Sequence, residues 1–304
     1  MFEWVRQATD LAPGVLLAMG LTIALIALGF VVPMAATRGK QSDLGDHYAR
    51  LRSWTMVAGS LMLALALGPL AIALLFGWVA AQGMHEWLRL LPDPLPRPLV
   101  VVCQTLAVVL PLVLWVGHAG GVALPTLLGG LGTAVLLVTP LLVLTLGSLQ
   151  QFVPQLGMVG FGLSLCVWSP CHAMALGLLL FAVLVGDAMQ YVAGKLLGRH
   201  KLAPVLSPKK TWEGLLGGAV LTGVLVALAA PQLLHVPALA GFALGLLATL
   251  AGFVGDVTIS AVKRWAGIKD TGTLLPGMGG LLDRADSLTL AAPLWWHVLG
   301  LVGG

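Results

Sequence analysis

The stretch "SAVKRWAGIKDTGTLLPGMGGLLDRADS", residues 260–287, decides how this chain is organised. Only 9% of the 304 residues are charged, yet lysines, arginines and aspartates gather here beside a run of glycines. Long apolar runs lie on both sides of the stretch. Because charge inside a bilayer is costly, a mixed-charge segment between such runs indicates a polar site at a membrane boundary.

The apolar runs predict transmembrane helices. The chain is 59% hydrophobic with a mean hydropathy of +0.99. In lipid the backbone must satisfy its own hydrogen bonds, which favours helices. The fold class predicted is an all-α polytopic membrane protein with about ten transmembrane helices and a polar cavity facing the cytoplasm. We expect spans near residues 13–35, 54–68, 70–87, 98–117, 122–146, 152–168, 172–192, 214–231, 237–262 and 287–302.

The basic residues predict the orientation. The segment 54–87 is long for one helix, and Gly68-Pro69 marks a break between two short ones. With that break and both termini outside, all but Arg6 of the 16 basic residues fall on one side. Basic loops face the cytoplasm, so we expect a multi-pass protein of the cytoplasmic (inner) membrane.

Three regions follow from this pattern. Residues 1–50 form an N-terminal extension with one extra helix, which is too long an apolar run for a cleaved leader. Residues 51–150 supply further membrane helices. Residues 151–304 carry the polar motifs and are the expected catalytic region.

Acidic residues inside apolar runs are functional candidates. Asp187 and Asp256 each follow a glycine near the end of such a run, and Ser260 and Lys263 share the helix face of Asp256. Asp283 and Asp286 lie one turn apart, so both can face one site. Carboxylates of this kind suit Mg²⁺, which shares phosphate ligands. The alternatives are aspartates that reach the interface and an intrahelical ion pair around Arg284.

Two further segments predict anion binding. In "LSPKKTWEG", residues 206–214, Ser207 is an expected helix N-cap and Pro208 the first helical residue. Lys209 and Lys210 would then stand beside free backbone N–H groups, an anion site. The alternative is a lysine pair that touches lipid headgroups. In "PGMGG", residues 276–280, the glycines allow close backbone approach to a phosphate.

Cations from several loops, metal-binding carboxylates and backbone donors together favour phosphoryl or nucleotidyl transfer. At this point the sequence resembles a known family, the phosphatidate cytidylyltransferases, also called CDP-diacylglycerol synthases. The residues of the downstream signature are Ser260, Lys263, Arg264, Lys269, Asp270, Gly272, Pro276, Gly279, Gly280, Asp283, Arg284 and Asp286. The upstream block from Asp187 to Glu213 is similar too, as is Glu86-Trp87.

The resemblance implies that CTP and phosphatidate react at a bilayer surface to give CDP-diacylglycerol and pyrophosphate. It implies Mg²⁺ on Asp256 and Asp283, with a potassium ion as a further candidate, a homodimer as the expected assembly, and no nucleic acid partner. The catalytic residues it implies are Asp256, Asp283, Asp286, Lys263, Arg264 and Lys269. The substrate- and cofactor-binding residues it implies are Ser207, Lys209, Lys210, Asp187, Asp270, Gly279, Gly280 and Arg284.

One departure is Met278, which stands where the family pattern has histidine. A thioether neither carries a proton nor binds Mg²⁺ well. If that histidine acts on phosphate, activity falls or changes; if it packs the turn, methionine is harmless. The alternatives are therefore a transferase for another lipid phosphate, a catalytically lapsed relative, and an ion-coupled membrane lipid transporter.

Overall fold

The computed structural model describes residues 69–90, 173–203 and 207–302, and separate residues between 52 and 67 and between 97 and 109. The predicted spans 13–35, 122–146 and 152–168 lie outside the described residues, as does the N-terminal extension. The other predictions can be compared with the structure.

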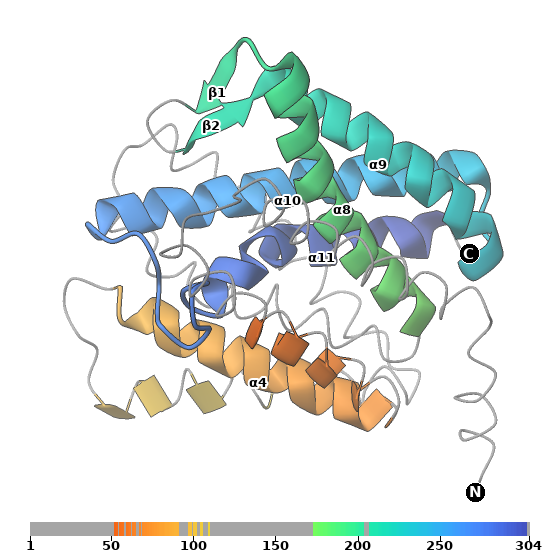
Figure 1. The fold of residues 1–304 in the computed structure, drawn as a ribbon. Helices are drawn as coiled ribbons and strands as arrows, with labels where there is room; N and C mark the ends of the chain where they lie inside the picture. The colour runs from red at the N-terminus through yellow and green to blue at the C-terminus, as the bar shows by residue number, and fades with distance from the viewer. Residues whose placement is uncertain are drawn as a thin grey trace, which may run out of the picture.

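Helices dominate the described part, as the apolar runs predict (Figure 1). They are α4 (Pro69–Leu88), α8 (Ala173–Leu197), α9 (Trp212–Leu233), α10 (Ala238–Trp265) and α11 (Leu282–Val302). Each coincides with one predicted span. Three segments are long and apolar enough to cross a membrane, namely Ala175–Leu197, Trp212–Leu233 and Ala238–Arg264. The chain is therefore mostly helical with membrane character, and the total of ten spans stays a prediction.

One element was not predicted. Strands β1 (Lys201–Ala203) and β2 (Ser207–Thr211) form an antiparallel hairpin between α8 and α9, drawn at the top of Figure 1. Lys201 pairs with Thr211, and Ala203 pairs with Ser207. The expected helix start at Ser207 and Pro208 is therefore wrong. Thr211 is the N-cap instead, because its hydroxyl accepts the N–H of Gly214 at 3.1 Å.

The helices pack around α10, which contacts α8, α9 and α11. Their main core joins α4 with these helices through fully buried side chains such as Ile72, Leu176, Val226, Leu244 and Trp295. A second cluster lies nearer the charged residues and holds the ends of α4, α10 and α11 together. It consists of Ala80, Trp87, Leu90, Ile259, Val262, Leu282 and Ala285.

Candidate active site

Three aspartates from three helices face one region. Asp187 comes from α8, Asp256 from α10 and Asp286 from α11, and each interacts electrostatically with the other two. Ser287 lies between them: its hydroxyl donates to Asp187 Oδ2 at 3.3 Å, and its backbone N–H donates to Asp286 Oδ1 at 2.8 Å. The three helices thus bring their carboxylates together.

Glycine lets α10 and α11 approach at this point. A Cβ atom on Gly255 would lie 2.5 Å from the carbonyl oxygen of Asp286, closer than side chains tolerate. Small residues permit such contacts between membrane helices. Because Gly255 precedes Asp256, the same contact that joins the helices brings Asp256 next to Asp286.

Lys210 is one cation of this group. Its Nζ forms an ion pair with Asp256 Oδ2 and lies 4.4 Å from the centre of the Phe253 ring. Ser260 Oγ donates to the other carboxylate oxygen, Oδ1, at 3.2 Å, as the helical spacing predicts. Lys210 is half-buried whereas Lys209 is exposed. Successive strand residues point to opposite faces, so β2 separates the two lysines that a helix start would have placed together.

Glu213 stabilises the base of the hairpin that carries Lys210. This carboxylate accepts the backbone N–H groups of Arg199 and His200 at 3.0 and 3.2 Å, and it contacts the His200 ring. The Trp212 N–H donates to the His200 carbonyl at 3.0 Å. Glu213 therefore joins the end of α8 to the start of α9.

Asp283 lies deeper and has a different set of partners. Lys263 Nζ donates to Oδ1 at 2.7 Å, and the N–H groups of Thr271 and Gly280 donate to Oδ2 at 2.7 and 2.9 Å. Burial acts to raise the pKa of Asp283, but the hydrogen bond from Lys263 and those from the two N–H groups hold it below its ordinary value. Lys263 was expected on the face of Asp256; here its ammonium reaches Asp283.

The glycine turn before α11 folds around this carboxylate. Gly279 has φ of +90°, and a Cβ atom there would lie 2.7 Å from Asp283 Oδ2. The N–H groups of Met278 and Gly279 donate to the Leu275 carbonyl, and that of Gly280 donates to Asp283. These N–H groups thus donate to acceptors within the protein. A phosphate contact at Gly279 and Gly280 stays a prediction.

Four of the other predicted site residues lie near the ends of α10 and α11 or in the loop between them. Arg264 is exposed and donates to the Ile268 carbonyl at 3.1 Å. Arg284 donates through Nε and Nη2 to the Met278 carbonyl at 3.2 and 2.9 Å. Lys269 and Asp270 are exposed in the loop between the two helices, and Ser207 opens β2.

Met278 itself is buried with Leu275 and Leu281, and Val57 and Val79 pack against this cluster. Its side chain is 6% exposed. In this chain the position where the family pattern has histidine is therefore a packing position, and an apolar thioether suits it.

Glu86 and Thr271 were missing from the predicted site. Glu86 is 2% exposed, and its carboxylate accepts the N–H groups of Leu281 and Leu282 at 2.8 and 2.9 Å. The Thr271 hydroxyl lies 2.8 Å from Glu86 Oε2 and 3.1 Å from Asp283 Oδ2. The sequence did indicate Glu86 as a functional candidate, because it is an ionisable residue in an apolar helix.

The donor set fits a hard divalent cation that also takes ligands from substrate. Carboxylate and hydroxyl oxygens from Asp256 and Ser260 are of the type Mg²⁺ prefers. Within the described ranges, no three His, Cys, Asp or Glu side chains form a metal-binding group by themselves. A magnesium ion held by one or two carboxylates would complete its coordination with water and phosphate oxygens.

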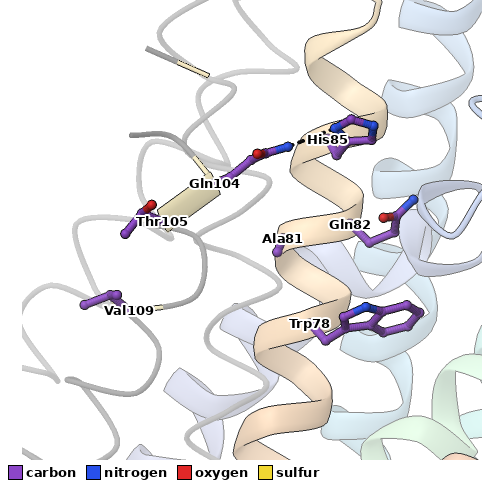
Figure 2. Close-up of a pocket in the computed structure, with 7 residues that line it drawn as sticks. All are labelled: Trp78, Ala81, Gln82, His85, Gln104, Thr105 and Val109. Atoms are coloured by element: carbon purple, nitrogen blue, oxygen red, sulfur yellow. Dashed lines mark hydrogen bonds between the residues drawn. The ribbon is translucent and has the colours of Figure 1, made fainter. Parts of the chain in front are cut away.

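An open groove of about 540 Å³ lies elsewhere, along α4 (Figure 2). Trp78, Gln82 and His85 line it from α4. Gln104 also lines it, and its Nε2 lies 2.8 Å from His85 Nδ1. None of the predicted site residues lines this groove.

Comparison with known sequences identifies the family of this chain. Residues 48–302 match the cytidylyltransferase family. The chain belongs to that family. It is 31% identical to the phosphatidate cytidylyltransferase of Haemophilus influenzae over an alignment that covers 81% of this chain and 95% of the relative.

Two other relatives match over shorter segments. An uncharacterized Escherichia coli protein, YnbB, is 46% identical over 113 residues, which cover 37% of this chain and 38% of YnbB. The phosphatidate cytidylyltransferase of Mycobacterium tuberculosis strain H37Rv is 41% identical over 124 residues, 41% of this chain and 38% of the relative. In both matches the chain spans about two fifths of the relative's length.

Proposed function

We propose that this cytidylyltransferase-family protein transfers the cytidylyl group of CTP to phosphatidate, giving CDP-diacylglycerol and pyrophosphate. The observation that carries the proposal is the match over 95% of the length of the Haemophilus influenzae enzyme. The arrangement of aspartates and lysines on membrane helices supports it, because a nucleotide and a lipid phosphate both need cations at the membrane surface.

In this reaction a phosphate oxygen of phosphatidate attacks the α-phosphorus of CTP, and the bond to the β-phosphate bridging oxygen breaks. Pyrophosphate leaves with that electron pair, so the protein supplies no nucleophile. Catalysis then depends on positioning and on neutralising phosphate charge. Lys209 and Lys269 are exposed, while Lys210 is half-buried beside Asp256. We assign phosphate contacts to these three lysines.

The proposed metal is Mg²⁺ on Asp256 and Asp283, with potassium as a second candidate. When bound, the divalent ion neutralises the phosphates and the pyrophosphate leaving group. Asp283 would hold the ion through a carboxylate that also accepts from Lys263 and the turn. We further propose that the site faces the cytoplasm, where CTP is present, and that the protein works as a homodimer in the bilayer.

The test is pyrophosphate release by the purified full chain in detergent. We expect release from CTP only when phosphatidate and Mg²⁺ are both present, with formation of CDP-diacylglycerol. A polyprenyl phosphate in place of phosphatidate tests the alternative lipid substrate, and a series of Mg²⁺, Mn²⁺, Ca²⁺ and K⁺ tests the metals. Absence of turnover with every lipid would reject the proposal.

Met278→His separates a lapsed relative from an active one. Because Met278 packs in an apolar cluster, we expect the wild type to be active and the imidazole to bring no gain. An inactive wild type whose activity appears in Met278→His would establish the lapsed alternative.

A further inference from the structure

Glu86 is a buried carboxylate whose partners come mainly from a distant segment. Burying a charge is costly unless hydrogen bonds compensate for the lost water. Within α4, Gln82 Nε2 donates to Oε1 at 3.2 Å. The other three contacts come from residues 271–282, nearly 200 positions away in the sequence. Glu86 thus connects α4 to the turn that precedes α11.

Two carboxylates share the start of α11. The first N–H groups of a helix have no partner inside it and favour negative charge. Gly280 N–H donates to Asp283, and the next two, of Leu281 and Leu282, donate to Glu86. Of three successive backbone N–H groups, Asp283 therefore accepts one, and Glu86, distant in the sequence, accepts the other two.

Thr271 lies between the same two carboxylates. Its hydroxyl has one hydrogen, so it donates to Glu86 or to Asp283 at any moment. Asp283 already accepts from Lys263 and two N–H groups, whereas Glu86 lacks a lysine partner among the described contacts. Thr271 therefore couples the position of Glu86 to that of Asp283.

The turn is closely packed against Glu86. A Cβ atom on Gly280 would lie 2.2 Å from Glu86 Oε2. On the other side of the turn, Ser53 Oγ donates to the Pro276 carbonyl at 2.9 Å, and Val79 of α4 packs on the Met278 cluster. The N-terminal part of the described chain thus holds the turn from two directions.

We propose that Glu86 is a positioning residue for the transfer reaction, an inference that rests on the proposed function. By holding the Leu281 and Leu282 N–H groups and the Thr271 hydroxyl, it fixes the start of α11. That fixed start sets where the Asp283 carboxylate lies relative to Lys263 and to substrate phosphate. The described hydrogen bonds of Glu86 go to Gln82, Thr271, Leu281 and Leu282, so it acts on Asp283 through its neighbours.

The main test compares Glu86→Gln with wild type. A glutamine of equal size accepts with one oxygen only and places an NH₂ group against a backbone donor. We expect kcat to fall about tenfold to a hundredfold, the range seen when a partner of a metal ligand is removed, while KM for phosphatidate changes little. Hydrogen exchange at amides 280–282, measured without substrate, should become faster.

Thr271 supplies a second pair of variants in case Glu86→Gln folds poorly. Thr271→Val removes the shared hydroxyl and should lower kcat, as Glu86→Gln does. Thr271→Ser keeps a hydroxyl and should have a kcat close to that of wild type. The matched control is Gln104→Leu, which breaks the hydrogen bond to His85 on the groove side of α4. This control should leave both kcat and exchange at 280–282 unchanged.

Two results would overturn the inference: unchanged exchange at 280–282 in Glu86→Gln, or a kcat loss that Gln104→Leu reproduces. A purely structural role would lower the melting temperature without separating kcat from KM. Wild-type protein that lacks turnover with CTP and phosphatidate contradicts the proposed function instead. The exchange measurement then still decides whether Glu86 holds the turn.

Discussion

Two lysine–aspartate pairs serve the site, and they differ in depth. Lys263 and Asp283 have side-chain exposures of 10% and 2%, whereas those of Lys210 and Asp256 are 22% and 26%. The first pair lies within one sequence block, between α10 and α11. The second joins the hairpin to α10 and so connects the two blocks.

This difference in exposure indicates different roles for the two pairs: the buried pair stabilises the structure, and the more exposed pair can bind a ligand. A buried pair is costly to break, because the remaining charge has no water to solvate it. A more exposed pair contributes less to stability, and its lysine can exchange the aspartate for another anion. We therefore expect Lys263 to fix the structure of the site, and Lys210 to be available to a phosphate.

The largest expected effect comes from Lys263→Met. It leaves the Asp283 charge buried without its cation, which should lower the free energy of unfolding by about 3–5 kcal/mol. Denaturation in detergent with increasing SDS would measure it. The double variant Lys263→Met with Asp283→Leu removes both charges and should recover much of the loss; if it recovers nothing, the pair is not the cause.

A smaller loss is expected from Gly279→Ala, which disturbs the same pair from the turn. The positive φ and the approach to Asp283 Oδ2 should together lower the free energy of unfolding by about 1–3 kcal/mol. Gly267→Ala is the matched control, because Gly267 has φ of +70° but nothing within 4 Å of an added Cβ. Equal losses in the two variants would show that only backbone strain matters.

Lys210→Met should cost about 1 kcal/mol or less in stability. Its effect on turnover should be larger, since a phosphate loses a cation in the site. Lys195→Met is the control, because Lys195 is exposed in the last turn of α8 and is not among the lysines assigned to phosphate, and the melting temperature and kcat of both variants would be compared with wild type. A stability loss as large as that of Lys263→Met would remove the distinction between the pairs.

The smallest effect is expected from moderate acid. Because the pKa of Asp283 is lowered in the folded protein, its contribution to stability is present above the unfolded value of about 3.9 and is lost as the pH falls through the folded pKa. Asp283 should therefore not change the melting temperature between pH 7 and 5. In Lys263→Met the carboxylate loses its cation, so the acid loss should begin at a higher pH.

The sequence predicted the helices well because their signal is local. Long apolar runs place α8, α9, α10 and α11 within a few residues of their observed bounds. The hairpin was missed because a short pair of strands carries no such period. Ser207-Pro208 has the composition of a helix start, but pairing with β1 extends the backbone and moves the cap to Thr211.

The sequence by itself determined the family, the membrane helices and most of the charged residues near the candidate site, since these depend on composition and spacing. Only the tertiary structure decided which charges meet. Lys263 shares a helix with Asp256 yet pairs with Asp283, and Glu86 reaches a turn nearly 200 residues away. Buried charges must find partners wherever packing brings them, and that choice is made by contacts between helices.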